Sequence, residues 1–179
     1  MAAYLVLSDI HSNLDALEAV LAAVDGQWDR LLVLGDLVGY GGEPNGVIDR
    51  IRALNPVAVI RGNHDKASSG LMDLKDFNPI AGLAALWTRD QLTPENLEWL
   101  RSLPQGPVQI PGLPDVQFVH GSPIDEDEYL VTLHDALAPL SALPALVTFF
   151  GHTHLQGAFS FKIAAGDAYR PVYRTIGQS

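Results

Sequence analysis

Residues 31 to 40 read Leu31-Leu-Val-Leu-Gly-Asp-Leu-Val-Gly-Tyr40 and join a short apolar run to a turn. Four consecutive apolar residues predict a buried strand, and Gly35 then lets the chain turn sharply. Asp36 follows at the carboxyl end of this strand, which is where open α/β sheets bind ligands. This segment therefore predicts a strand that presents one carboxylate at the edge of a sheet.

Four other apolar runs end in the same way. They are Tyr4–Leu7 before Asp9-Ile-His11, Val57–Ile60 before Arg61-Gly-Asn-His-Asp65, Val116–Val119 before His120-Gly-Ser122, and Leu146–Phe150 before Gly151-His-Thr-His154. Each run leads into residue types that ligate metal ions. The rest of the chain is expected to be a scaffold that brings these five strand ends together.

Composition indicates one globular domain, residues 1–179, with 47% hydrophobic and 18% charged residues. The net charge of -10 argues against a nucleic-acid-binding surface, although bound divalent cations would still attract a single phosphate. The absence of Cys excludes disulfides and thiolate ligands. No signal-peptide pattern and no apolar stretch of membrane-spanning length is found, so we expect a cytoplasmic protein without a membrane partner.

The first part of the chain alternates strands and helices. Expected strands are Tyr4–Leu7, Leu31–Leu34 and Val57–Ile60, and expected helices are Ser12–Val24, with Ser12 as N-cap, and Pro44–Leu54. This βαβαβ order predicts a parallel sheet with right-handed crossovers.

The second part of the chain predicts a second, smaller sheet. Lys66–Asp76 is expected to be a polar loop, and two helices are expected after it, at Pro79–Gln91 and Pro94–Leu103. A hairpin of Val108–Ile110 and Val116–Val119 should follow, and then a helix at Thr132–Leu143 and a strand at Leu146–Phe150. The last expected elements are closing strands at Ala158–Ile163 and Val172–Ile176 around a Gly166-Asp167 turn.

Histidine placement indicates a metal centre. Five of the six His follow the apolar runs directly, namely His11, His64, His120, His152 and His154. One such His is usually a core or loop residue, but five of them, accompanied by Asp9, Asp36 and Asn63, indicate ligands. Imidazole, carboxylate and amide oxygen suit manganese, iron, nickel or zinc. The eight groups suffice for two metals, with Asp36 as the simplest bridge.

Two adjacent metals suit phosphoryl chemistry, because they acidify a shared water and neutralise phosphate oxygens. The leaving alkoxide then needs a proton, which His64 can supply. Asp65 is expected to orient the His64 ring and to keep it protonated.

Five ordered motifs, Asp9-Ile-His11, Gly35-Asp36, Gly62-Asn-His-Asp65, His120-Gly121 and Gly151-His-Thr-His154, resemble those of the calcineurin-like metallophosphoesterases. The resemblance implies a four-layer α/β/β/α sandwich of two mixed sheets with a dinuclear centre at one edge. It assigns one metal to Asp9, His11, Asp36 and His154, and the other to Asp36, Asn63, His120 and His152. It also implies attack by a hydroxide held between two divalent ions, manganese being the first choice, with His64 as the acid.

Two departures from the family's motifs indicate to which subgroup of the family the chain is most similar. No Arg follows Gly35-Asp36, and the third motif ends in Asp65 instead of Glu, so the chain resembles the small bacterial and archaeal phosphodiesterases. A phosphodiesterase acting on a small phosphate ester is the first hypothesis, and a dinucleoside polyphosphate pyrophosphohydrolase is the alternative. A silent protein-interaction scaffold is disfavoured because all the ligand residues are present.

The C-terminal end of the sequence also departs from the family pattern. The Asn-Pro-Gly-Ser stretch that usually follows the last motif is missing, so either this member is short or its closing strands are absent from the sequence. The oligomeric state is left open, with a homodimer as one option.

Several residues have two alternative interpretations. Asn13 either binds a substrate phosphate or bonds its own helix start, and Tyr40 either stacks on a base or packs. Arg61 is expected to pair with a nearby carboxylate, and the acidic run Asp125–Glu128 to be a solvated loop.

Overall fold

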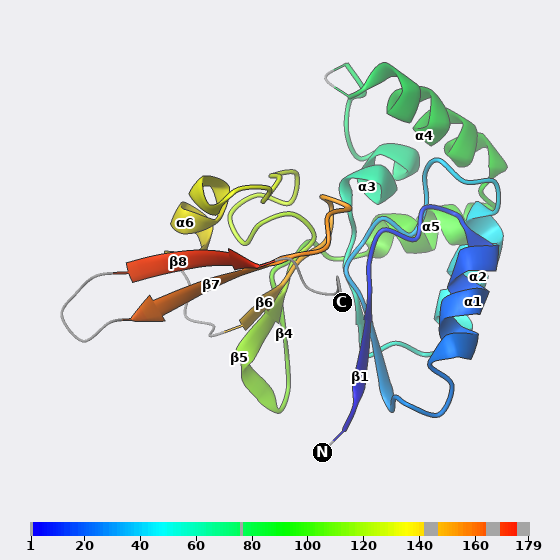
Figure 1. Ribbon diagram of the computed structural model, residues 1–179. Coiled ribbons are helices and arrows are strands. Elements are labelled where there is room, and N and C mark those ends of the chain that lie inside the picture. The colour runs from blue at the N-terminus through cyan, green and yellow to red at the C-terminus, as the bar shows by residue number, and fades with distance from the viewer. Residues whose placement is uncertain (1, 76, 142–146, 164–168, 175–179) are drawn as a thin grey trace.

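The computed structural model describes residues 2–75, 77–141, 147–163 and 169–174. Two three-stranded β-sheets pack face to face, and helices cover the outer face of the first (Figure 1). The first sheet is parallel in the order β1-β2-β3, with strands β1 (Tyr4–Leu7), β2 (Arg30–Val33) and β3 (Ala58–Val59). The expected parallel sheet is thus confirmed.

The central strand β2 is buried on both faces. Leu31 and Val33 pack into the core beneath the helices, whereas Leu32 and Leu34 pack toward the second sheet. Successive side chains of a strand point to opposite faces, so burial of both sets places β2 between two layers. This explains why residues 31–34 form an uninterrupted apolar run.

Three helices cover the outer face of the first sheet, α1 (Leu14–Ala23), α2 (Pro44–Ala53) and α5 (Pro94–Ser102) (Figure 1). Two further helices, α3 (Asn63–Ser69) and α4 (Pro79–Gln91), pack against each other beyond the carboxyl ends of the strands. Thr93 caps α5 as expected, because its Oγ1 accepts a hydrogen bond from the Asn96 N–H at 3.2 Å.

The second sheet is mixed and contains β4 (Val108–Ile110), β5 (Leu113–Phe118) and β6 (Val147–Phe149). β5 runs antiparallel to β4 and parallel to β6. Ile110 and Phe118 pack against Leu32, Leu34 and Ile60 of the first sheet. A further antiparallel pair, β7 (Ala158–Ile163) and β8 (Tyr169–Arg174), contacts α6 (Leu133–Ser141). The predicted α/β sandwich of two sheets flanked by helices is confirmed.

Helix α3 was not expected, because its residues were predicted to lead directly into a polar loop. It lacks an apolar stripe, and most of its buried side chains are polar, namely Asn63, His64, Asp65, Ser68 and Ser69. Hydrophobic periodicity detects helices that pack on an apolar core, so it misses one that packs polar groups around a site.

Smaller differences concern element ends. Asn13, not Ser12, caps α1, because Asn13 Oδ1 accepts from the Ala16 N–H at 3.0 Å. β8 begins at Tyr169, before the expected Val172. The predicted Gly166-Asp167 turn and the predicted ends of the helix at Leu143 and of the strand at Ile176 lie outside the described residues.

None of the helices within the described residues has both the length and the apolar character needed to cross a bilayer.

Candidate metal centre

The predicted ligand residues gather where the strands of both sheets end. Asp9 follows β1, Asp36 follows β2, and Asn63 opens α3 just after β3. His120 and His152 follow β5 and β6 of the second sheet. The carboxyl ends of parallel strands meet at one edge of a sheet, so the two sheets together present all of these residues to one place.

The backbone at this edge is strained. Five of the seven predicted ligand residues have positive φ angles, namely Asp9 (56°), His11 (50°), Asp36 (51°), His152 (66°) and His154 (53°). The left-handed region costs non-glycine residues about 1 kcal/mol each, so the surrounding structure must hold them there. Hydrogen bonds from the Asp9 N–H to the Gly35 carbonyl (3.1 Å) and from the His11 N–H to the Asp36 carbonyl (2.9 Å) do so.

The first candidate ligand group consists of Asp9, His11, Asp36 and His154, whose ligand atoms all lie within 4.8 Å of one another. His11 Nδ1 lies 3.1 Å from the Val38 carbonyl, to which it donates, so Nε2 keeps a free lone pair. That nitrogen lies 2.9 Å from His154 Nε2 and 3.6 Å from Asp36 Oδ2. Two imidazole nitrogens and two carboxylates this close together fit one divalent ion.

The second candidate group consists of Asp36, His120 and His152, and it shares Asp36 with the first. His120 Nδ1 donates to the Leu34 carbonyl at 2.8 Å, and His152 Nε2 donates to the Asp127 carbonyl at 3.2 Å. These bonds leave one nitrogen of each ring free, as metal-binding imidazoles require. Asn63 Oδ1 lies 3.1 Å from His120 Nε2, so the fourth expected ligand is also at this place. This set of donor groups therefore fits two metal ions, with the Asp36 carboxylate belonging to both groups of ligands.

Charges in the centre are strongly coupled through Asp36. Burial alone would raise the pKa of Asp36, but His120, His64 and His11 around it lower that pKa to about 2. Burial would likewise lower the pKa of His120, but the Asp36 carboxylate 3.4 Å from its Nε2 raises it to about 9. A metal ion bound at His120 Nε2 would compete with a proton for that nitrogen.

His64 lies beside the ligand groups and donates its backbone N–H to Asp36 Oδ1 at 2.8 Å. Its ring packs against Tyr40 and Phe77, with centroid distances of 4.5 and 5.1 Å. Burial lowers the pKa of His64 to about 4, although the nearby Asp36 opposes the shift. His64 Nδ1 is buried and finds no hydrogen-bond partner within the described part of the chain.

The expectation that Asp65 orients the His64 ring is wrong. Asp65 Oδ1 accepts from the Val38 N–H at 3.1 Å, and Oδ2 accepts from the Gly62 N–H at 3.0 Å. Burial and repulsion from Asp36 raise the pKa of Asp65 to about 7. Asp65 thus ties the turn after β2 to the turn before α3 and acts on the loop backbone instead of on the His64 ring.

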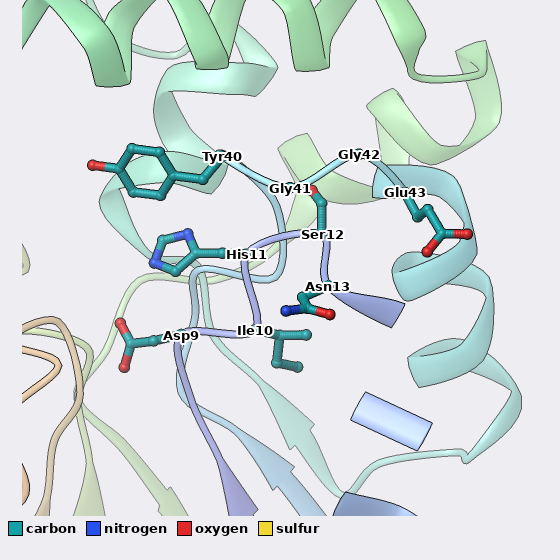
Figure 2. Close-up of a pocket in the computed structure, with 9 residues that line it drawn as sticks. All are labelled: Asp9, Ile10, His11, Ser12, Asn13, Tyr40, Gly41, Gly42 and Glu43. Carbon is teal, nitrogen blue, oxygen red and sulfur yellow. The ribbon is translucent and has the colours of Figure 1, made fainter. Parts of the chain in front are cut away.

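Two hollows open beside the ligand groups. One, of about 570 Å³, is lined by residues 9–13 and 40–43, and the other, of about 220 Å³, by Asp36, Tyr40, Asn63, His64, Tyr129 and residues 152–154. Figure 2 shows the side chains of Asp9, His11 and Tyr40 pointing to the same side of the first hollow, whereas Glu43 points away from them. Asn13 lines this hollow, and its Oδ1 accepts the α1 cap bond, which leaves unused by that bond the Nδ2 donor that a phosphate would need.

The acidic run Asp125–Glu128 is not simply a solvated loop. Glu126 is buried and binds both Arg61, with Nε–Oε2 and Nη2–Oε1 distances of 3.0 and 2.9 Å, and Lys66 Nζ at 3.0 Å. Lys66 also reaches Asp127 Oδ2 at 2.6 Å. The pairing expected for Arg61 is present and joins this loop to the turn before α3, while Lys66 joins the loop to α3 itself.

Tyr129 is the site residue that sequence reasoning missed. Its ring stacks on the His152 ring, with centroids 3.8 Å apart and planes inclined by 26°. No apolar run or motif marks position 129, so only the fold brings it to the centre.

The fold and the grouped ligands define a metal-binding α/β protein built at the edge of two sheets. The chain belongs to the calcineurin-like phosphoesterase family, whose model matches residues 3–156. Members of this family are metal-dependent, in agreement with the two ligand groups.

Individual relatives agree with this assignment. An uncharacterized protein of Methanocaldococcus jannaschii, MJ0912, is 37% identical over 151 residues, which are 84% of this chain and 61% of that protein. A symmetrical bis(5'-nucleosyl)-tetraphosphatase of Yersinia enterocolitica is 36% identical over 115 residues, 58% of this chain and 36% of that enzyme. The chain thus spans less than two thirds of the length of either relative.

Solved structures show the same architecture. A metallophosphoesterase from Sphaerobacter thermophilus superposes with a TM-score of 0.74 at 39% identity, over 87% of this chain and 62% of that one. A hypothetical protein, PH1004, from Pyrococcus horikoshii has a TM-score of 0.77 at 23% identity over 88% of this chain and 72% of that one, which supports the fold alone.

Proposed function

We propose that this protein is a metal-dependent phosphodiesterase that hydrolyses a small phosphate ester. The observation that carries the proposal is the pair of ligand groups that share Asp36 and adjoin the hollow lined by His64. Two divalent ions, when bound there, would supply Lewis-acid activation of a water molecule and neutralise the phosphate charge. Manganese is the first candidate, with iron, nickel and zinc as alternatives.

The chain's own residues hold and orient these partners. Asp9, His11 and His154 would bind one ion, Asn63, His120 and His152 the other, and Asp36 both. The main-chain carbonyls that accept hydrogen bonds from His11, His120 and His152 fix the orientation of each ring before an ion binds.

His64 would protonate the leaving oxygen through Nε2. The pKa of its ring is lowered to about 4 in the protein alone, so the ring is neutral at pH 7. A bound phosphate is negative and would raise this pKa, whereas the two bound cations would lower it. Proton donation by His64 is therefore part of the proposal for the substrate complex and not a property of the free protein.

A nucleotide pyrophosphohydrolase is the second candidate, supported by the relatives that are named bis(5'-nucleosyl)-tetraphosphatases. A polyphosphate chain needs cations along its length. Among the described residues that line the two hollows, none is lysine or arginine. Arg61 and Lys66 are nearby, but both are engaged by Glu126. This charge distribution favours a substrate with a single phosphate.

The test is hydrolysis by chelator-treated protein, with and without added Mn²⁺, of bis-p-nitrophenyl phosphate, p-nitrophenyl phosphate and diadenosine tetraphosphate. We expect metal-dependent cleavage that is fastest for the diester. Faster cleavage of the tetraphosphate would establish the second candidate instead. No cleavage of any of the three by protein with bound metal would contradict both and favour a protein-interaction scaffold.

A further inference from the structure

Two half-exposed tyrosine rings line the hollow next to the ligand groups. Tyr40 is 52% exposed and Tyr129 is 57% exposed, and both line the smaller hollow together with Asp36 and His64. Exposed aromatic rings beside a site of phosphate chemistry offer surfaces on which flat groups can stack.

Each ring rests on histidines of the centre. Tyr40 lies with its ring centroid 5.0 Å from that of His11 and 4.5 Å from that of His64. Tyr129 stacks on His152, a residue of the second ligand group. One tyrosine is therefore anchored at each ligand group, and a substrate phosphate held by both groups would have its substituents within reach of these rings.

The loop that carries Tyr129 is held in place before any ligand binds. Glu126 and Asp127 bind Lys66, and the Asp127 carbonyl accepts from His152 Nε2 at 3.2 Å. The backbone at Tyr40 is also held, because Gly41 directly after it donates its N–H to the His11 carbonyl at 3.0 Å, and the Tyr40 ring packs against His11 and His64. Rings that are already ordered lose little conformational entropy when a ligand stacks on them.

The charge of the residues that line the hollows also favours recognition through aromatic contact. The larger hollow contains Asp9 and Glu43 and, among its described lining residues, no cationic side chain. Beyond the phosphate itself, recognition then depends on uncharged groups, among which the aromatic rings offer the largest contact surface.

From these observations we infer that Tyr40 and Tyr129 bind a planar aromatic group of the substrate, such as a nucleobase, and that the substrate is a phosphodiester carrying such a group. This inference rests on the proposed phosphodiesterase function and names the substrate class of the same site. A ten-fold preference corresponds to about 1.4 kcal/mol, which lies within the range found for stacking one base on an aromatic side chain.

Two esters with the same leaving group test the inference. We compare p-nitrophenyl thymidine 5'-phosphate with methyl p-nitrophenyl phosphate, using Mn²⁺-loaded protein. The nitrophenolate is common to both, so the ratio of their kcat/KM values reports on the thymidine alone. We expect a ratio of at least about ten in the wild type, a ratio near one in Tyr129→Leu, and an unchanged ratio in Tyr129→Phe, which retains the ring.

A binding measurement separates this inference from the proposed function. Calorimetry of thymidine 5'-monophosphate against methyl phosphate needs no turnover, and the nucleotide should bind at least about ten-fold more tightly to the wild type than to Tyr129→Leu. If this preference is found but neither ester is cleaved, the stacking inference stands and the phosphodiesterase proposal fails.

The opposite outcomes overturn the inference. If both esters are cleaved at equal efficiency and both phosphates bind equally, the protein is a phosphoesterase without aromatic recognition. A preference that persists in both Tyr129→Leu and Tyr40→Leu would place the recognition elsewhere.

Discussion

Asp36 is the residue on which the candidate centre depends most. Its carboxylate lies in both ligand groups, and Oδ1 also accepts the His64 N–H at 2.8 Å. Asn at this position keeps an acceptor for that N–H but removes the negative charge. Asp36→Asn is therefore expected to fold and to lose most of its bound metal and activity.

Metal content by elemental analysis after dialysis against Mn²⁺ checks this expectation. Asp15→Asn, which removes an exposed carboxylate from the first turn of α1, is the control and should load metal as the wild type does. Full metal occupancy in Asp36→Asn would contradict the bridging assignment.

His64 is assigned to proton transfer and not to metal binding. His64→Gln is therefore expected to retain both ions and to lower kcat by about 10² or more with alkyl leaving groups, where a general acid contributes most. With a nitrophenyl leaving group the loss should be smaller, because nitrophenolate leaves readily without a proton. Elemental analysis and the two rates measure this, and a loss of metal in the variant would show that the acid assignment is wrong.

At the scale of elements, the turns after β2 and β3 pack without room for a side chain. A Cβ at Gly62 would collide with Asp36 Oδ1 and lie 2.5 Å from the Asp36 nitrogen. Gly62→Ala is therefore expected to lower the free energy of unfolding by about 3 kcal/mol, because such overpacking forces the backbone to move.

Urea unfolding measures this change, and Gly82→Ala is the control. A Cβ at Gly82 in α4 meets nothing within 4 Å, and Ala is the better helix former by about 1 kcal/mol. The control should thus be as stable as the wild type or more so. Equal stability of Gly62→Ala would mean that the two turns can separate.

The loop before α6 is joined to α3 through Glu126. Burial alone would raise the pKa of Glu126, but hydrogen bonds from Arg61 and Lys66 lower it below its ordinary value of 4.5. A carboxyl whose folded-state pKa is lowered stabilises the fold above its unfolded-state pKa and loses this contribution as the pH falls through the folded-state pKa. Glu126→Gln is thus expected to cost about 1–3 kcal/mol at pH 7 and progressively less below pH 4.5.

Thermal melts of wild type and Glu126→Gln across this pH range test the ion cluster. A difference in stability that stays constant from pH 7 to acid would show that the charge of Glu126 contributes nothing.

At the scale of the whole molecule, the centre joins segments from both sheets. Ligand residues come from position 9 to position 154, so the two ions bound by them would together link the ends of β1, β2, β3, β5 and β6. A ligand that binds only the folded state stabilises it by about 2.7 kcal/mol at 100 times its dissociation constant. For a chain of this size, that corresponds to a rise in melting temperature of about 5–10 °C.

Differential scanning calorimetry of chelator-treated and Mn²⁺-loaded protein measures this rise, and Asp36→Asn should not show it. An unchanged melting temperature in the wild type, at saturating Mn²⁺, would mean that no ion bridges the two sheets.

Local signals in the sequence were enough to predict the strands, most helices and the residues that gather into the two candidate ligand groups. Apolar runs, glycine turns and proline residues at helix starts act over a few residues, so they are visible without a fold. The five strand ends also share one chemistry, and parallel strands bring their carboxyl ends to one edge.

The tertiary structure alone decided which partner each polar group takes. Asp65 binds a backbone N–H 27 positions away, Glu126 binds Arg61 across 65 positions, and the Asp9 carboxylate accepts the His152 N–H across 143 positions. The polar helix α3, the buried Glu126 and the place of Tyr129 on His152 likewise depend on packing between distant segments. Such contacts leave no periodic trace in the sequence, because the residues that make them are selected by proximity in the folded chain and not by neighbours along it.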